Sequence, residues 1–304
     1  MEDGHSEDYF KEFRDFWWNH DFLELMARRL RLAECSKLLD VGCGQCHWSR
    51  LLVSFMNSPA EIHAVDADPR WSKGSDELRR FFASQGQGSA VTFKQGDAQA
   101  LPYDSDSFDI VTCQTTLIHV RNPRAAVIEM HRVVKPGGLV LCAEPNNVVS
   151  SLVKSNLSAE DSIEDTIRDV KHALMLERGK MLLGEGDNSY GDLLPGVFSE
   201  VGFDDIRVYL SDKASPLYPP YETLEQQALL RTDQEWSAED SGPCDWEKQR
   251  RYLRALGDEY LACFEELQKR SRSNLTRYCD AVKNKRYSSG GGLIMYLVSG
   301  RKVE

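Results

Sequence analysis

Two glycines and one carboxylate have the residue types and spacing that a nucleoside site requires. Gly42 and Gly44 stand between an apolar segment and a helical segment, where glycine lets the backbone turn tightly and brings bare amides up to a ligand. Asp66 ends the next apolar segment, and a carboxylate there can accept hydrogen bonds from both ribose hydroxyls of an adenosine. The alternative role for Asp66 is a cap on the following turn. The pattern favours a cofactor that carries a nucleoside.

The same loop argues against two common nucleotide sites. A dinucleotide fingerprint, G-x-G-x-x-G, would need glycine at position 47, where this chain has His47 followed by the bulky Trp48. The sequence also lacks the G-K-[ST] phosphate loop of many ATP-binding proteins. These absences disfavour NAD and ATP as the bound nucleotide.

The elements that must position this loop alternate between two patterns. Short apolar segments predict strands at residues 37–41, 62–65, 91–93, 107–113, 139–142, 206–210 and 293–298. Helical patterns cover residues 7–32, 48–56, 76–84, 123–134, 150–190 and 195–202, and most of 217–287. The apolar face expected within 150–190 comprises Ile163, Ile167, Val170, Ala173, Leu174 and Leu176. The alternation predicts an α/β fold with a parallel sheet covered on both faces.

Composition limits the partners and the compartment. The chain of 304 residues has a formal net charge of −11, which disfavours nucleic acid as a partner. No apolar run approaches the roughly 18–20 residues that span a bilayer, so no membrane partner is expected. The first eight residues are acidic and polar, unlike a secretory signal, so we expect a cytoplasmic protein.

Eight cysteines are scattered through the chain, most of them in apolar segments, as reduced buried thiols are. Cys43 and Cys46 form a C-x-x-C pair. A zinc or redox reading would need a second pair or suitably spaced histidines, and none is evident. We therefore expect reduced cysteines and no metal.

Five segments of this chain resemble, in order and spacing, the motifs of Rossmann-like (class I) S-adenosylmethionine-dependent methyltransferases, in particular the ubiquinone/menaquinone-biosynthesis-like branch. These segments are Leu38–Gly44, Ala64–Asp66, Gly96–Ala98 with Leu101-Pro102, Ser107–Val111 and Arg132–Gly138. A sixth similarity covers residues 193–195 and 201–203. The resemblance implies a Rossmann-like, seven-stranded, mostly parallel sheet with helices on both faces, together with N-terminal helices and helical insertions that form a cap.

The resemblance also implies S-adenosyl-L-methionine as the cofactor and assigns a contact to each motif residue. Gly42 and Gly44 would line the methionine part, and Asp66 would bind the ribose. The remaining contacts fall on residues that follow three strands: Ala67 near the adenine, Asp97 at the adenine amino group, Ala98 through its backbone amide, and Gln114 at the amino-acid end. Asp97 has the alternative of an Asx-turn residue. Cys46 departs from the family, which usually has a third glycine there.

His119 is the candidate general base, for acceptors that carry a proton at the working pH. It follows the fourth strand, at a place that faces the reaction centre in the resembling family. A structural histidine at a helix start explains it equally well. Trp17 and Trp18 have two readings as well, as core residues or as a lid on the cofactor.

The expected organisation has an N-terminal helical cap at 1–32 and a core at 33–148, 190–210 and 290–304. Helical insertions at 150–190 and 217–287 would form the acceptor cap, and aromatic residues of the second would line a small-molecule pocket or an oligomerisation surface. These expectations favour methyl transfer to a small-molecule acceptor. RNA or protein methylation stays open because residues 245–286 hold 11 Lys/Arg against 7 Asp/Glu. A non-catalytic cofactor-binding protein and a homodimer also stay open.

Overall fold

The computed structural model describes residues 11–303, and these divide into two compact units. The core unit comprises residues 18–145, 190–212 and 295–303. The helical unit comprises residues 11–17, 146–189 and 213–294. Among the described residues, no helix combines the length and the apolar composition that a bilayer span requires.

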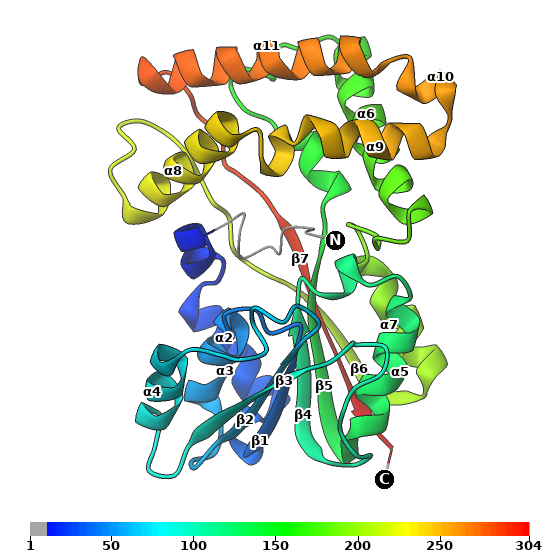
Figure 1. Ribbon diagram of the computed structural model, residues 1–304. Coiled ribbons are helices and arrows are strands. Elements are labelled where there is room, and N and C mark those ends of the chain that lie inside the picture. Colours follow the sequence, from blue (N-terminus) through cyan, green and yellow to red (C-terminus); the bar gives the residue numbers. More distant parts are fainter. Residues whose placement is uncertain (1–10, 304) are drawn as a thin grey trace. The chain divides into compact units, whose positions relative to one another are not determined.

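The core unit is built on a seven-stranded sheet with the strand order β3-β2-β1-β4-β5-β7-β6 (Figure 1). The strands are β1 (Lys37–Val41), β2 (Glu61–Asp66), β3 (Ala90–Gln95), β4 (Phe108–Gln114), β5 (Val134–Asn146), β6 (Phe203–Leu210) and β7 (Ile294–Lys302). The pairs from β3 through β5 are parallel, whereas β6 and β7 are antiparallel to each other. The predicted α/β class and the mostly parallel seven-stranded sheet are therefore confirmed.

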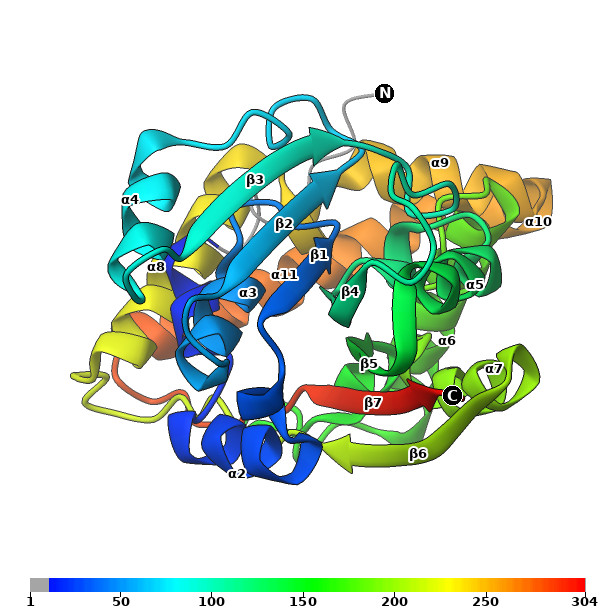
Figure 2. The same ribbon diagram turned by 90° about the horizontal axis from the view of Figure 1, so that it is seen from below.

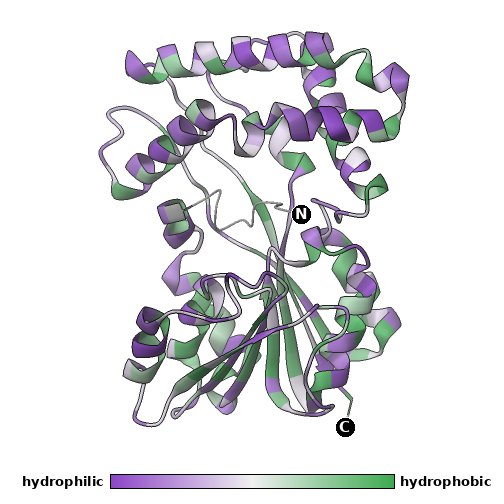
Figure 3. Ribbon diagram, in the orientation of Figure 1, coloured by the Kyte–Doolittle hydropathy of each residue, from purple (hydrophilic) through white to green (hydrophobic). Residues whose placement is uncertain are grey.

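Helices cover both faces of this sheet. In Figure 2, α2 (His20–Leu30), α3 (His47–Leu52) and α4 (Asp76–Ser84) lie on one side of the strands. On the other side lie α5 (Pro123–Val133) and α7 (Leu194–Val201). Central strands buried on both faces need near-continuous apolar sequence, and Leu38, Leu39, Ile110 and Val111 are fully buried. The sheet is correspondingly the most hydrophobic part of Figure 3.

The helical unit contains the 3-10 turns η1 (Lys11–Phe16), η5 (Val148–Leu152) and η7 (Gly242–Cys244), with five α-helices. These are α6 (Ile163–Leu182), α8 (Leu224–Glu239), α9 (Trp246–Leu256), α10 (Asp258–Leu261) and α11 (Phe264–Lys283). One of its apolar clusters is formed by Met175 of α6 with residues of α9 and α11, namely Trp246, Leu253, Phe264 and Leu267. Most of α11 is hydrophilic on its surface (Figure 3).

The continuous helix predicted for 7–32 is wrong over its described part. The chain forms η1, leaves helical geometry at residues 17–19 and restarts as α2. Asn19, the N-cap of α2, has extended backbone angles, and Trp18 is 9% exposed. Three- and four-residue apolar spacing continues through this break, so it could not reveal it. Residues 7–10 lie outside the described part of the chain.

The apolar face predicted for 150–190 is correct only in part, because Val170, Ala173 and Leu176 are half-buried and Leu176 packs against the apolar cluster of the helical unit. Helix covers only α6 and the short turn η5, and Ile163, Ile167 and Leu174 are 74%, 60% and 50% exposed. The buried residues of α6 are Met175, Gly179 and Lys180. They are buried because α6 packs against α9 through its C-terminal half. A smaller difference concerns β5, which starts at Val134 and includes the Pro-Gly-Gly segment, with a register shift against β4.

Gly179 makes the approach of α6 to α9 possible, since a Cβ at this position would lie 2.2 Å from the carbonyl oxygen of Tyr252. We expect Gly179→Ala to lower the free energy of unfolding by about 1–3 kcal/mol, because the two helices must move apart. Gly196→Ala in α7, where a Cβ would meet no atom within 4 Å, is the matched control. It should gain about 0.5–1 kcal/mol through helix propensity. Urea unfolding of both variants measures these changes. A Gly179→Ala variant as stable as the parent protein would contradict this packing.

Candidate functional site

Three alternate residues in the loop between β1 and α3 have left-handed backbone conformations. Gly42, Gly44 and Cys46 have φ angles of 68°, 47° and 59°. The amides of Gly42 and Cys43 donate to the carbonyl oxygen of Val65, at 2.8 and 3.1 Å, which fixes the loop at the carboxyl end of β2. Glycine tolerates such angles without a steric cost, so the two glycines are required by the backbone itself.

Cys46 adopts the same region with a side chain, which costs of the order of 1–2 kcal/mol. The side chain is fully buried and makes a hydrogen bond with Cys43. This bond and burial hold the pKa of the Cys43 thiol well above its ordinary value. The departure from the usual glycine is therefore accommodated in the protein interior. All eight cysteines are free, and the described residues bring no three His, Cys, Asp or Glu side chains into a metal-binding group.

Gly42 also lies directly against the segment that follows β4. A Cβ at position 42 would stand 2.4 Å from both Oγ1 and Cγ2 of Thr116. The Thr116 hydroxyl is within hydrogen-bond distance of the carbonyl oxygen of Val41, at 3.1 Å. The loops after β1 and β4 are therefore in close contact, and any side chain at position 42 would separate them.

Asp66 is buried at the end of β2, and its two carboxylate oxygens accept from different backbone amides. Oδ2 accepts from the amide of Gly44 and Oδ1 from that of Asp68, both at 2.9 Å. Asp66 thus caps the turn that follows it, as the alternative reading held, and also ties the glycine loop to β2. Ala67 follows Asp66 at an exposed position.

Asp97 and Ala98 follow β3, the neighbour of β2. The amide of Gly96 donates to the carbonyl oxygen of Asp66 at 3.0 Å, which brings the two strand ends together. The exposed Asp97 accepts from the amide of Gln99 at 2.8 Å, so it does form an Asx turn. Ala98 is half-buried and packs against the core.

Gln114 ends β4 and is 6% exposed, yet its Oε1 atom has no hydrogen-bond partner among the described residues. Such an unpaired buried acceptor is uncommon, because folded proteins pair nearly all their buried polar atoms. The strand order places the segments after β3, β2, β1 and β4 side by side along one edge of the sheet. The expected residues therefore share that edge, at the position where the strand order reverses.

His119 is the last residue of the 3-10 turn η4 (Leu117–His119), and it is exposed. Its amide donates to the carbonyl oxygen of Thr116 at 2.9 Å. The turn follows β4 directly, so His119 lies at the same edge of the sheet as Gln114.

Glu144 of β5 is a residue of this edge that the sequence analysis missed. It is fully buried, and its carboxylate accepts from the amides of Thr116 and Leu117, both at 2.9 Å, and of Ile118 at 3.4 Å. The Cys113 thiol donates to it at 3.4 Å. Burial raises the pKa of Glu144 to about 7, although these amides favour the charged form. A glutamate directly after five apolar strand residues was the available signal, because a buried carboxyl group requires donors.

The raised pKa of Glu144 predicts a pH dependence of stability. The unfolded chain releases this proton near pH 4.5 and the folded chain only near pH 7, so stability falls as pH rises through this window. The loss should amount to about 3 kcal/mol in the free energy of unfolding. Glu144→Gln, which resembles the protonated acid, should lack this part of the slope in urea unfolding from pH 5 to 8.

Glu129→Gln is the matched control for this measurement. A hydrogen bond from Arg132 lowers the pKa of Glu129, so that carboxylate stays ionised from pH 5 to 8. The control should therefore be destabilised by the same amount at every pH. Parallel profiles for the parent protein and Glu144→Gln would show that Glu144 does not titrate in this window.

Comparison with known proteins agrees with the geometry of this edge. Residues 39–142 match the family described as "Methyltransferase domain". A demethylmenaquinone methyltransferase from Staphylococcus epidermidis is 33% identical over 175 residues, covering 57% of this chain and 70% of that protein. The enzyme of the same name from Bacillus subtilis is 35% identical over 118 residues, 38% of this chain and 48% of that protein.

Two solved structures share the fold. The YcgJ protein from Bacillus subtilis aligns with a TM-score of 0.50 at 20% identity, covering 94% of this chain and all of that one. A candidate methyltransferase from Bacillus halodurans aligns with a TM-score of 0.50 at 18% identity, covering 93% of this chain and all of that one. At these identities the likeness concerns the fold. On the sequence relationship, the chain belongs to the S-adenosylmethionine-dependent methyltransferases, with S-adenosyl-L-methionine as the methyl donor.

Proposed function

We propose that this methyltransferase acts on a small-molecule acceptor. The observation that carries the proposal is the relationship to the Staphylococcus epidermidis enzyme, which is named demethylmenaquinone methyltransferase and not after a nucleic acid or a protein. The net charge of −11 supports it, because an acidic protein repels polyanions.

The proposed cofactor site uses the strand-end residues described above. Gly42 and Gly44 line the methionine part, Asp66 at the end of β2 holds the ribose, and Gln114 receives a donor from the amino-acid end. The adenine contacts in this proposal are Ala67, Asp97 and Ala98. When bound, S-adenosylmethionine supplies a methyl carbon on a sulfonium, an electrophile that needs no further activation. The protein's contribution is to position the acceptor and exclude water.

His119 is proposed as the base for an acceptor that carries a proton at the working pH. Its support is the fixed backbone before it, because Glu144 holds the amides of residues 116–118. An exposed imidazole on an anchored turn can reach an acceptor without moving the strand end.

The helical unit is proposed to select the acceptor. The family match at residues 39–142 lies entirely within the core unit and leaves the helical unit outside it. The aromatic residues expected to line a pocket there do not all qualify. Tyr221, Trp246 and Tyr252 are 4%, 7% and 6% exposed, which makes them packing residues of the helical unit. Tyr218, at 53% exposed, is better placed for a ligand.

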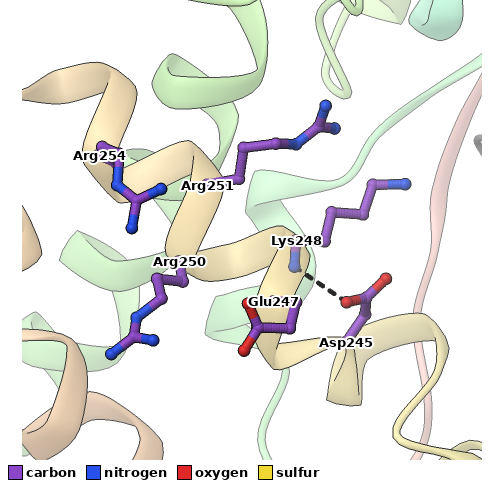
Figure 4. Close-up of a pocket in the computed structure, with 6 residues that line it drawn as sticks. All are labelled: Asp245, Glu247, Lys248, Arg250, Arg251 and Arg254. Atoms are coloured by element: carbon purple, nitrogen blue, oxygen red, sulfur yellow. Dashed lines mark hydrogen bonds between the residues drawn. The ribbon is translucent and has the colours of Figure 1, made fainter. Parts of the chain in front are cut away.

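RNA is the second candidate acceptor. The observation that supports it is the group of basic residues on helix α9. A surface hollow of about 380 Å³ on this helix is lined by Asp245, Glu247, Lys248, Arg250, Arg251 and Arg254. Figure 4 shows Lys248 and Arg251 extending to one side of α9, and Arg250 and Arg254 to the other. The cations therefore do not converge on one point, and two carboxylates stand among them.

Some basic residues of segment 245–286 form ion pairs with acidic residues of the helical unit. Arg251 pairs with Glu185 at 2.7 Å, and Arg270 pairs with Asp165 and Asp169 at 2.8 and 2.7 Å. Each acidic partner reduces the positive potential that a phosphate backbone would meet. These ion pairs lower the positive potential of the segment, which favours the small-molecule acceptor.

To test the acceptor class, the full chain is incubated with S-adenosylmethionine and one acceptor at a time, and the S-adenosylhomocysteine that forms is measured. We expect release with reduced demethylmenaquinone or a related small quinol. Release only with RNA or a protein extract would overturn the small-molecule proposal, as would no release with any acceptor class. A mobility-shift titration against salt would separately report RNA affinity.

Asp66→Ala should weaken the binding of S-adenosylhomocysteine at least tenfold in calorimetry, because a hydrogen bond to a charged group contributes roughly 1.5–3 kcal/mol. Asp109→Ala is the matched control. Asp109 also accepts from two backbone amides, those of Ser36 and Lys37, but it stands at the opposite edge of the sheet. This control should lose stability and keep its affinity. Unchanged affinity in a folded Asp66→Ala variant would place the cofactor elsewhere.

A further inference from the structure

Helix α6 carries a line of apolar side chains on a face that its own unit leaves uncovered. Ile163, Ile167 and Leu174 are 74%, 60% and 50% exposed, and Met181 is 39% exposed. At about 100° per residue, these four positions fall within about 40° of one another around the helix axis. Val170 belongs to the same line and is half-buried. Contiguous apolar surface of this kind, unlike a single exposed leucine, marks an interaction site.

The packing of the helical unit occupies the other side of α6. Met175 and Gly179 are buried where the helix meets α9 and α11. Nearer the start of α6, Arg270 of α11 pairs with Asp165 and Asp169 at 2.8 and 2.7 Å. These buried and paired positions lie about 100° or more around the axis from the centre of the apolar line. The line therefore points away from α9 and α11.

The spacing along this line is that of a helix that pairs with another helix. Successive apolar positions are separated by four, three and four residues, which is the heptad spacing of a two-helix interface. The next position of the series is Glu177, which accepts a hydrogen bond from the Ser189 hydroxyl and interrupts the apolar run. The uninterrupted part, called the seam below, consists of Ile163, Ile167, Val170 and Leu174.

The residues that flank the seam differ between its two sides. Glu164 and Lys171 lie on one side, seven positions apart, and both are exposed. Thr166 and Ala173 lie on the other side, and their small side chains allow a partner helix to approach closely. One flank thus carries one charge of each sign, and the other flank carries no charge.

A second copy of the seam fits this pattern when the two helices run antiparallel. With Ile163 of one copy opposite Leu174 of the other, Ile167 stands opposite Val170, and the two-fold symmetry repeats both contacts. All four layers of the pair are then apolar. Antiparallel pairing also brings like flanks together, so Glu164 of each copy lies beside Lys171 of the other. A parallel pair would instead set the charged flank against the uncharged one.

We propose that the seam of α6 binds the seam of a second copy of this chain in the antiparallel arrangement. This surface lies wholly in the helical unit and does not depend on the proposed cofactor site. Four apolar layers form an interface smaller than that of a stable dimer, so the association is reversible, with a dissociation constant in the micromolar range. Sedimentation velocity of the full chain, from low micromolar to several hundred micromolar and without cofactor, measures it.

Ile167→Asp should weaken this association more than tenfold, because each dimer would bury two carboxylates without partners. Leu182→Asp is the matched control, since Leu182 belongs to the same helix, is 61% exposed and lies outside the seam. It should associate as the parent does. A parent chain that stays monomeric throughout would overturn the proposal, as would equal weakening in the two variants. A monomeric parent that Ile167→Asp alone destabilises would show the seam covered within one molecule.

A charge exchange tests the antiparallel register itself. Glu164→Lys and Lys171→Glu should each weaken self-association about fivefold or more, because each dimer would then contain two like-charge pairs. An equimolar mixture of the two variants should recover the parent affinity to within about twofold. In the mixed dimer the new lysine faces the new glutamate, while the native Lys171 faces the native Glu164. A mixture that associates no better than either variant alone would overturn the proposed arrangement.

Discussion

The edge of the sheet that holds the candidate cofactor residues depends on the contact between the backbone of Gly42 and the side chain of Thr116. A Cβ at position 42 would stand 2.4 Å from Thr116, so the loops after β1 and β4 meet only if that position is glycine. These strands are neighbours at the place where the order of the sheet reverses, which is where open α/β sheets generally bind their ligands. Asp66 and Glu144 hold the two loops from either side, through the amide of Gly44 and the amides of residues 116–118.

Glu144 and Asp66 both accept hydrogen bonds from backbone amides, but their surroundings differ. Glu144 is fully buried, and three backbone amides and a thiol converge on it, so it is fitted to hold a turn in place. Burial opposes its charge strongly enough to raise its pKa to about 7. Asp66 receives one amide on each oxygen and stands at an exposed turn, where Ala67 reaches solvent. Asp66 therefore stands next to solvent-accessible backbone, whereas Glu144 lies wholly in the interior.

The first half of the core unit could be predicted well from the sequence, because the residues that begin and end its helices and strands act locally. Strand β1 and helix α4 have the expected bounds, and α7 ends at Gly202 with a φ of 97°. Predictions failed where a partner distant in sequence decides. The buried face of α6 depends on a close approach to Tyr252, which apolar spacing does not encode. Likewise, the break before Asn19 leaves the apolar pattern unaltered, and the donors for Glu144 come from another strand end.

The same distinction separates residue type from residue function in the candidate site. Aromatic residues were expected to mark an acceptor pocket in the helical unit, but Trp246 and Tyr252 are buried in its own packing, and the indole of Trp246 is paired with Asp240. Trp18 has the same side chain and a similar burial, and its N–H has no acceptor among the described residues. The two tryptophans therefore differ in their hydrogen bonding. Because folded proteins pair nearly all their buried polar atoms, an unpaired one carries more information about a ligand than the chemical type of the side chain.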